Sequence, residues 1–345
     1  MKRPKITVLM SVYNGEEYLK KAIESILNQT FVDFEFLIID DGSTDETAKI
    51  LKGYKNKDKR IKIVTNKKNI GLTKSLNKGL KLARGKYIAR MDADDISNFQ
   101  RLEKQKKYLD QHPKVLAVGS NTKVINENDK TISANRWQQS PESIYYTLTF
   151  YTCLFHSSLM LRKNSLIKSG GYNVKFPVSQ DTELLYRLSR KGKIAFLEEI
   201  LIKWRKTGNN ISSRYKAQQS AFTKKQFIKN IKSIMGPKVK INNLLCFHNE
   251  GFPDRHPINI SLDSLLTLEK LQSKIVVDCP KWLKKQALKK YADKKLEKYL
   301  WQFYKRKKFI TPACLSAFLK FKKPTFFVVC KKARQKLIAF IKNEA

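Results

Sequence analysis

The sequence predicts an α/β protein in which a mixed, mainly parallel sheet is flanked by helices. Two observations predict this class: short apolar runs alternate with segments of helical apolar spacing, and polar residues follow the apolar runs where strands would end. Parallel strands need long crossover connections, which helices usually supply. With 345 residues, of which 41% are hydrophobic and 29% charged, the chain is long enough to bury a sizeable core.

The first half of the chain shows the clearest alternation. Residues 6–12 are typical of a buried strand, and residues 18–27 place their apolar side chains on one helical face. The helix predicted at 99–112 ends before Pro113, which cannot continue it. Further strands are predicted at 34–39, 61–65, 87–91 and 115–120, and further helices at 72–83 and from residue 46 onward.

The second half is less regular. Residues 154–161 are predicted to form a strand that leads to the turn 169–172, and residues 181–191 a helix that Gly192 ends. After about residue 215 the chain becomes rich in lysine and helical in tendency. We therefore expect two domains, the α/β domain at 1–215 and a basic, mainly helical region at 216–345.

The cysteines and the apolar segments indicate the cellular compartment of the protein. The five cysteines lack the paired spacing of a disulfide framework or a zinc site, which favours a reducing compartment. The amino terminus has basic residues before an apolar run of only about eight residues, which we interpret as a first strand and not as a signal peptide. No apolar stretch approaches the roughly 20 residues that span a bilayer. The expected location is cytoplasmic, with peripheral attachment to the inner face of the cytoplasmic membrane left open.

Positive charge is concentrated towards the carboxyl terminus. The formal net charge is +40, and residues 281–345 contain 20 basic and three acidic residues. Such a surface fits nucleic acid, anionic lipid or simple solubility. The interleaved apolar residues form either a membrane-facing stripe or a small helical core that the lysines solvate. They are Trp282, Leu283, Leu288, Tyr291, Tyr299, Trp301, Phe303 and Tyr304.

Carboxylates gather after one predicted strand, which needs an explanation in so basic a chain. Asp92, Asp94 and Asp95 follow the run 87–91, and like charges this close repel unless water or a cation holds them. An Asp-X-Asp turn suits a hard divalent ion, Mg²⁺ or Mn²⁺, that shares its coordination shell with a diphosphate. A solvated acidic turn is the alternative.

Polar residues also follow the first two predicted strands. Adjacent aspartates precede Gly42, which permits a tight turn, and Asp45 suits the start of a helix. A carboxylate such as Asp41 at a strand end can accept a hydrogen bond from a base or ribose, and Tyr13 can stack on a base. Ligands of open α/β sheets bind beyond the carboxyl ends of the strands. We therefore expect three segments to converge on one rim: 11–15, 40–45 and 92–95.

Four stretches of the first 130 residues form a recognisable set. In order, they are VLMSVYNGEEYLKKAIESILNQTF, FLIIDDGSTDET, NKKNIGLTKSLNKGLKLARGKYIARMDADD and RLEKQKKYLDQHP. This set resembles the nucleotide-sugar-binding half of the family 2 glycosyltransferases, which have the GT-A fold. The resemblance covers residues 5–130 and extends more loosely to about residue 213, through HSSLMLRK, GGYNV, QDTELLYRLS and WRKTGNNIS.

The resemblance implies a donor site. Ser11, Tyr13 and Asp41 match positions that hold the base and ribose of a nucleotide sugar. Asp92 and Asp94 match the motif that binds Mn²⁺ or Mg²⁺ and, through this ion, the diphosphate. Asp92 is also expected to be one of the nucleotide-binding residues.

The resemblance also implies groups around the reacting carbon. Asp181 matches the general base, although its place near a predicted helix start would also suit capping. Inverting transfer is one in-line displacement, so a carboxylate must take the proton of the acceptor hydroxyl opposite the leaving diphosphate. Arg90 is expected to pair with the acidic cluster or with the nucleotide phosphates. The acceptor or phosphate side is assigned to His156, Gly171 and Arg205, although a lone histidine on a strand is more often structural.

One segment departs from the family pattern. Many relatives carry a histidine near the metal or diphosphate just ahead of the NNIS stretch, and Thr207 stands at that position here. Either Arg205 or Lys206 then neutralises the diphosphate, or the metal is bound more weakly than in relatives.

These features predict an inverting hexosyl- or N-acetylhexosaminyl-transferase. It would move a sugar from a UDP-sugar to a hydroxyl of a bacterial surface glycan, such as lipopolysaccharide or capsule. A nucleotidyltransferase acting on sugar phosphates is the first alternative, but no glycine-rich, basic phosphate loop follows the first strand. A basic nucleic-acid-binding protein is the second, but the tail carries no recognised motif and the acidic rim would repel phosphates.

Overall fold

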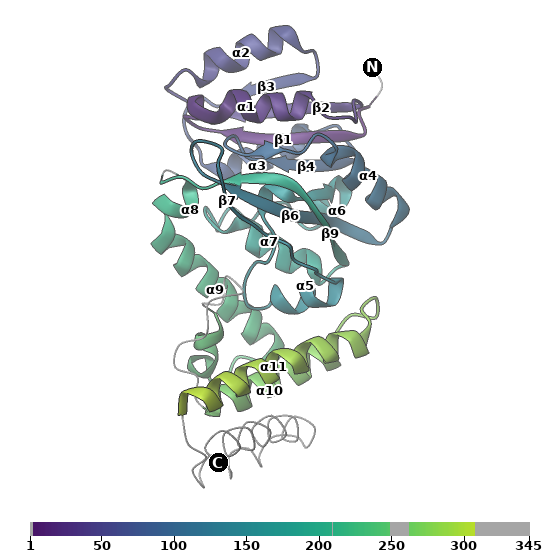
Figure 1. The fold of residues 1–345 in the computed structure, drawn as a ribbon, viewed down its shortest axis with the longest axis vertical. Helices are drawn as coiled ribbons and strands as arrows, with labels where there is room; N and C mark the ends of the chain where they lie inside the picture. The colour runs from purple at the N-terminus through teal and green to yellow at the C-terminus, as the bar shows by residue number, and fades with distance from the viewer. Residues whose placement is uncertain (1–2, 209, 249–261, 308–345) are drawn as a thin grey trace, which may run out of the picture. The chain divides into compact units, whose positions relative to one another are not determined.

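The computed structural model describes residues 3–208, 210–248 and 262–307 of a chain that divides into two compact units (Figure 1). The first unit comprises residues 1–148 and 152–226, and the second residues 149–151 and 227–345. The first contains the sheet, and the described part of the second is helical. The division into domains at 1–215 and 216–345 stays a prediction.

A nine-stranded mixed sheet forms the centre of the first unit. Its strands are β1 (Ile6–Val12), β2 (Phe34–Asp40), β3 (Ile61–Thr65), β4 (Tyr87–Met91), β5 (Ile96–Ser97), β6 (Val115–Ile125), β7 (Thr131–Ala134), β8 (Met160–Arg162) and β9 (Lys193–Arg205). Their order is β3-β2-β1-β4-β8-β6-β9-β5, with β7 paired to β6. The first four strands in this order are parallel, and β8 joins them through antiparallel pairs to the parallel pair β6 and β9.

Helices cover both faces of this sheet. One face is covered by α1 (Glu16–Leu27), α2 (Thr47–Lys57) and α4 (Arg101–Gln111), which pack with Val8 and Met10 of β1. The other is covered by α3 (Leu72–Leu82), α5 (Pro141–Thr147), α6 (Lys163–Lys168) and α7 (Gln180–Ser189), which pack with Leu9. Neighbouring strand residues point to opposite faces, so an unbroken apolar run needs both layers. The predicted α/β class, a mixed sheet flanked by helices, is confirmed.

The structure also confirms the alternation predicted for the first half of the chain. Every strand and helix predicted between residues 6 and 120 is present, with bounds that differ by a few residues. The strands β1, β2 and β4 are recognisable because they are buried on both faces, and α1 because its buried residues form one apolar stripe, Leu19, Ala22, Ile23 and Ile26.

The strand predicted at 154–161 is wrong for most of its length. A 3₁₀ turn, η1 (His156–Ser158), occupies its middle, and only the short strand β8 follows. The carbonyl of Ser158 accepts a hydrogen bond from Nε2 of Gln105 at 2.7 Å, so a buried side chain takes the place of a neighbouring strand. Leu154 and Leu159 reach the core without strand geometry.

The longest strand, β9, is not evident in the sequence pattern. Its 13 residues pair with β6, but the register shifts between Ser120, opposite Leu197, and Asn121, opposite Ile200. The side chain of Asn121 donates to the carbonyl of Glu198 at 2.7 Å inside this irregularity. A bulge of this kind breaks the period of two by which strands are recognised.

The described part of the second unit has its own small apolar core. It contains the end of α9 (Lys216–Met235), then η2 (Ile241–Phe247), α10 (Leu262–Val277) and α11 (Lys285–Lys307). The rings of Phe247 and Tyr299 lie 5.0 Å apart between centroids, and Leu283 and Leu288 are buried. These four residues favour a helical core over an exposed aromatic stripe. The side chains of Trp301, Phe303 and Tyr304 lie outside the described part.

Two further expectations concern thiols and membrane spans. Cys279 is a free thiol, whereas Cys314 and Cys330 lie outside the described residues. Within the described residues, no helix combines the length and apolar character that crossing a bilayer requires.

Candidate active site

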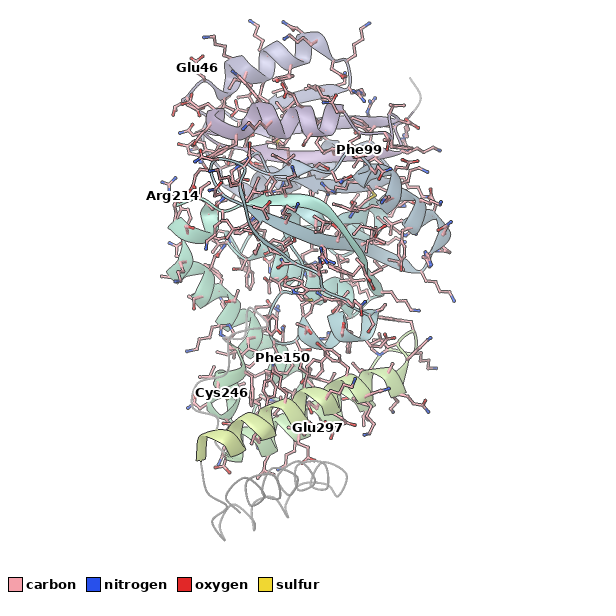
Figure 2. The ribbon with its side chains drawn as sticks, viewed as in Figure 1. Glu46, Phe99, Phe150, Arg214, Cys246 and Glu297 are labelled. Carbon is pink, nitrogen blue, oxygen red and sulfur yellow. The ribbon has the colours of Figure 1, made fainter. Side chains whose placement is uncertain are left out.

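The three polar segments that follow β1, β2 and β4 lie at one edge of the sheet. β1 pairs in parallel with both neighbours, so the carboxyl ends of the three strands point the same way. Hydrogen bonds join the loops after β1 and β2: the backbone N–H of Asn14 donates to Oγ of Ser43 (3.0 Å), and that of Thr44 donates to Oδ1 of Asn14 (2.9 Å). The N–H of Glu46, labelled in Figure 2, donates to Oε2 of Glu16 at 2.8 Å.

The residues that are expected to bind the nucleotide differ in their exposure to solvent and in the hydrogen bonds that they already make. Tyr13 is 46% exposed and Ser11 is half-buried, whereas Asp41 is buried. The Asp41 carboxylate accepts hydrogen bonds from Nδ2 of Asn66 (2.7 Å) and from the backbone N–H groups of Ile70 (3.0 Å) and Gly71 (2.9 Å). Asp41 thus fixes the loop after β3, and about one of its four acceptor positions remains for a base or ribose.

Three fully buried arginines hold the acidic turn that follows β4. Arg90 donates to the carboxylate of Asp92. Arg101 donates to the carbonyl of Arg90 at 2.7 Å, and Nε of Arg205 donates to the carbonyl of Asp94 at 2.8 Å. All three arginine side chains are among the largest groups that the fold removes completely from solvent. Their positive charge offsets the repulsion between the neighbouring carboxylates.

The carboxylates of this turn differ in burial and in partners. Burial, and next the charge of Asp92, raise the pKa of Asp94 to about 6. The amide of Asn210 donates to Oδ2 of Asp94 at 2.6 Å. Asp95 is fully buried, which raises its pKa well above the ordinary value, and its Oδ1 accepts the backbone N–H of Arg205 at 2.9 Å. Asp95 therefore supports β9, while Asp92 and Asp94 are the half-buried members of the turn.

Asp92 and Asp94 fit a divalent cation whose shell a diphosphate completes. Each keeps one carboxylate oxygen that, within the described part of the chain, accepts no bond from another residue and is not sealed from solvent. The raised pKa of Asp94 reflects a buried negative charge, which a cation would stabilise. Among the described residues, no cluster of three or more His, Cys, Asp or Glu could hold a metal ion. Mg²⁺ and Mn²⁺ commonly use few protein ligands when phosphates share the shell.

Arg205 has a structural position and is not open to a phosphate. Its Nη1 donates to the carbonyls of Asn126 (2.9 Å) and Glu127 (3.1 Å), and its Nη2 pairs with Oδ1 of Asp129 at 2.5 Å. The side chain is fully buried, and its Nε and Nη1 groups donate to backbone carbonyls, so the guanidinium is not open to a diphosphate. The hypothesis that Arg205 neutralises the diphosphate is therefore disfavoured, because its side chain ties β9 to the β6–β7 turn. The exposed Lys206 and a weaker binding of the metal remain as the alternatives.

Asn210 contacts the acidic turn three residues after Thr207, the position at which the family pattern has a histidine near the metal or diphosphate. The backbone N–H of Thr207 donates to Oδ1 of Asn210, and Asn210 in turn contacts Asp94. Asn210 and Asp94 are 116 residues apart, so no local pattern links them. The only signal in the sequence is that Asn210 belongs to the NNIS stretch.

Asp181 comes from the later part of the chain and lies within electrostatic range of the acidic turn. It lies in the first turn of α7, directly after Ser179, whose φ of 60° is left-handed. Burial raises the pKa of Asp181, backbone amides at the helix start oppose this, and the charges of Asp92 and Arg90 also act on it. The candidate base and the acidic turn therefore belong to one electrostatic environment.

His156 and Gly171 are connected through Tyr172. Nε2 of His156 lies 2.9 Å from the Tyr172 hydroxyl, and the charge of Asp181 acts on that hydroxyl. Gly171 has a φ of 67°, and a Cβ there would lie 2.7 Å from Oδ1 of Asn77. Gly171 thus serves the close packing of its turn on α3, whereas His156 contacts Tyr172 and lies within electrostatic range of Arg90.

Sequence comparison decides the family. The family described as glycosyl transferase family 2 matches residues 7–169. An uncharacterised glycosyltransferase of Haemophilus influenzae is 36% identical over 241 residues, which cover 66% of this chain and 73% of that protein. The chain belongs to glycosyltransferase family 2. The resemblance seen in the sequence is confirmed, and the protein is a glycosyltransferase.

Further relatives of this glycosyltransferase extend the comparison. The O-antigen biosynthesis glycosyltransferase WbnJ of Escherichia coli is 39% identical over 185 residues, 53% of this chain and 71% of that protein. The structure of S. aureus TarS with UDP-GlcNAc has a TM-score of 0.52 at 17% identity and covers 94% of this chain and 79% of that one. The mannosyltransferase PcManGT of Pyrobaculum calidifontis with GDP-Man and Mn²⁺ has the same score and identity and covers 96% and 85%. These structures confirm the predicted GT-A fold.

Proposed function

We propose that this glycosyltransferase moves a sugar from a UDP-sugar to a hydroxyl of a bacterial surface glycan, with inversion at the anomeric carbon. The proposal rests on the position of Asp181, whose charge interacts with that of Asp92 although the two belong to different layers of the fold. An inverting displacement requires these two acidic centres, one for the acceptor proton and one for the diphosphate. The nucleotide sugars bound by TarS and PcManGT support such a donor, and the name of WbnJ supports a surface glycan.

The donor is held by the rim in this proposal. The exposed ring of Tyr13 stacks on the base, while Ser11 and the remaining acceptor position of Asp41 bind the base or ribose. Asp92 and Asp94 hold Mn²⁺ or Mg²⁺, which when bound offsets negative charge on the departing diphosphate. Arg90 fixes one of these carboxylates and Asn210 the other, so both are oriented before the donor arrives.

Asp181 acts on the acceptor. Its carboxylate takes the proton of the acceptor hydroxyl while that oxygen bonds to the anomeric carbon. The bond from this carbon to the diphosphate oxygen breaks at the same time, and its electron pair leaves with the diphosphate. Because burial raises the pKa of Asp181, the carboxylate is a better proton acceptor than an ordinary aspartate.

A screen of nucleotide sugars tests the donor. With Mn²⁺ present, UDP-glucose, UDP-galactose or UDP-GlcNAc should raise the unfolding temperature of the full chain more than GDP-, dTDP- or CMP-sugars do. Ligand at 100 times its Kd adds about 2.7 kcal/mol of stability, which thermal unfolding detects readily. Slow hydrolysis of the preferred donor should release UDP. A larger effect of GDP-mannose would change the assigned nucleobase from uracil to guanine. If no nucleotide sugar had any effect with Mn²⁺ or Mg²⁺, the proposal would be contradicted.

We further propose that the acceptor is lipid-linked and that the second unit attaches the enzyme to an anionic membrane surface. Lys290, Lys294 and Lys298 are exposed on α11 at intervals of four residues. Within the described residues, the ion pair of this helix joins Lys289 and Asp293 instead. Like charges at this spacing slightly destabilise a helix, and an anionic surface would relieve the repulsion. Each basic residue near such a surface contributes about 1 kcal/mol.

Co-sedimentation of the full chain with lipid vesicles tests this attachment. Replacing the three α11 lysines by glutamine should reduce binding to vesicles that contain anionic lipid by at least about tenfold. The control is the same triple replacement on α2, at the exposed Lys52, Lys55 and Lys57, which changes the net charge equally. Equal losses in both variants would show only a charge effect, and no lipid-dependent pelleting of the unmodified protein would remove the membrane from the proposal.

A further inference from the structure

His156 and Tyr172 form a hydrogen-bonded pair that the proposed reaction does not yet use. Their rings meet edge to face with centroids 5.5 Å apart, and Nε2 of His156 lies 2.9 Å from the Tyr172 hydroxyl. Tyr172 is buried, and among the described residues its hydroxyl has no other partner. If the imidazole donated the proton of this bond, the buried O–H of Tyr172 would lack an acceptor, which is costly. The tyrosine is therefore the donor.

This direction of the hydrogen bond fixes the tautomer of His156. A neutral imidazole carries one N–H, so a lone pair on Nε2 places the proton on Nδ1. Burial, and next the charge of Arg90, hold the pKa of His156 well below its usual range, so the ring is neutral at pH 7. In the described part of the chain Nδ1 has no protein partner and is not sealed from solvent. His156 thus offers one N–H in a fixed direction.

The position of Tyr172 is fixed from two sides. The side chain of Asn77 donates to the Tyr172 carbonyl at 2.7 Å and accepts its N–H at 2.9 Å. Arg187 donates to the carbonyl just before Tyr172 at 2.8 Å and pairs with Glu183 at 2.7 Å. Glu183 shares the first turn of α7 with Asp181. The pair is therefore held in a constant relation to the candidate base.

The pair lies near the acidic turn, because the backbone N–H of Arg90, two residues before Asp92, donates to the carbonyl of Leu159 at 2.9 Å, three residues after His156. Burial raises the pKa of Tyr172, the charge of Arg90 opposes this, and the charges of Asp181 and Asp92 add to the increase. Asp92 belongs to the turn that holds the diphosphate, and Asp181 faces the acceptor hydroxyl. In an in-line displacement the anomeric carbon lies between these two groups, so the ring hydroxyls of the transferred sugar occupy the neighbouring space.

We propose that His156 recognises a hydroxyl group of the transferred sugar by donating a hydrogen bond from Nδ1, and that Tyr172 is the positioning residue that fixes its tautomer. This inference rests on the proposed function, because it requires a nucleotide sugar in this site. It assigns His156 to the donor sugar and not to the acceptor. A hydrogen-bond donor in a fixed position selects sugars that present an oxygen atom to it, so the pair contributes to sugar specificity.

Calorimetry on the full chain with Mn²⁺ tests whether Nδ1 or Nε2 of His156 donates the hydrogen bond to the sugar. The amide nitrogen of asparagine falls near Nδ1 of histidine, and that of glutamine near Nε2. The probes are UDP-glucose, UDP-galactose and UDP-GlcNAc, each compared with UDP. His156→Gln should weaken binding of the preferred UDP-sugar roughly three- to tenfold, as expected for one neutral hydrogen bond, and His156→Asn should stay within about twofold of the unmodified protein. Tyr172→Phe should fall between them, because the freed ring adopts both tautomers.

The affinity for UDP should be unchanged in all three variants, which also shows that the nucleotide site is intact. The inference is overturned if His156→Gln binds the UDP-sugar normally, if UDP binding falls equally, or if only the KM for the acceptor changes. If the unmodified protein binds none of these nucleotide sugars, the proposed function itself fails, and the two failures are thereby distinguished.

Discussion

Replacing Asp181 by asparagine should lower the rate of sugar transfer by about 10²- to 10⁴-fold and leave donor binding nearly unchanged. Asparagine keeps the shape of the side chain but cannot take a proton from the acceptor hydroxyl. In the proposed site the donor is held by the rim that follows β1, β2 and β4, while Asp181 lies on α7. Transfer assays should therefore show the loss in kcat, while calorimetry with UDP and Mn²⁺ should give an affinity within about twofold of normal.

A matched control separates catalysis from helix stability. Asp263 is also an acidic residue in the first turn of a helix, α10, and is exposed. Asp263→Asn removes the same kind of interaction with a helix terminus but touches no proposed site residue. It should leave transfer normal. Near-normal turnover by Asp181→Asn would instead make the assignment of the base wrong.

The pH profile provides a second measurement of the same group. Because burial raises the pKa of Asp181, it becomes protonated at a pH where an ordinary aspartate, with a pKa of about 3.9, is still ionised. The base must be ionised to act, so kcat/KM should fall as the pH decreases through this raised pKa. The residual activity of Asp181→Asn should not show this decrease in kcat/KM at low pH.

Asp94→Asn should change metal binding and stability in opposite directions. Loss of a ligand should weaken Mn²⁺-dependent UDP binding by at least about tenfold. The pKa of Asp94 is raised to about 6, so at pH 7 its ionised form is less stable in the folded than in the unfolded chain. Removing this charge should stabilise the metal-free protein by about 1–2 kcal/mol and raise its unfolding temperature by a few degrees.

The sign of the pH dependence follows from the same shift. Between the unfolded pKa of about 3.9 and the folded value of about 6, the folded chain binds more protons, so this contribution to stability decreases as the pH rises. Metal-free Asp94→Asn should lack the contribution. Asp92→Asn is the comparison, because it leaves the buried Arg90 without its carboxylate and should lower stability. A lower unfolding temperature for metal-free Asp94→Asn, or unaltered Mn²⁺-dependent binding, would contradict the role given to this residue.

Local patterns were sufficient to predict the strands and loops that carry the donor side. β1, β2 and β4 are buried on both faces and the helices after β1 and β2 are amphipathic, so each element is recognisable by itself. The order in which parallel strands pair then brings their ends together. β9 escaped prediction because the bulge near Asn121 interrupts its alternation.

Contacts between distant segments could not be predicted in the same way. The sequence singles out Arg90 and Arg205 as candidates for ion pairs, but in a chain with 70 lysines and arginines only the fold shows that they and Arg101 are all buried. Asn210 and Tyr172 likewise gain their meaning from partners far away in the sequence. Single side chains of this kind become candidates for function only when tertiary structure supplies their neighbours.

The three buried arginines also affect how the enzyme would return to its starting state after each reaction. Their permanent charge keeps the turn at Asp92–Asp95 in shape without help from an ion, so the apo form needs no refolding step before each round. An incoming cation then meets one carboxylate, Asp92, that Arg90 already neutralises and another, Asp94, whose buried charge it would stabilise, and the accompanying diphosphate adds to this attraction. We expect ion and spent nucleotide to depart together, which would leave the emptied enzyme immediately competent for the next donor.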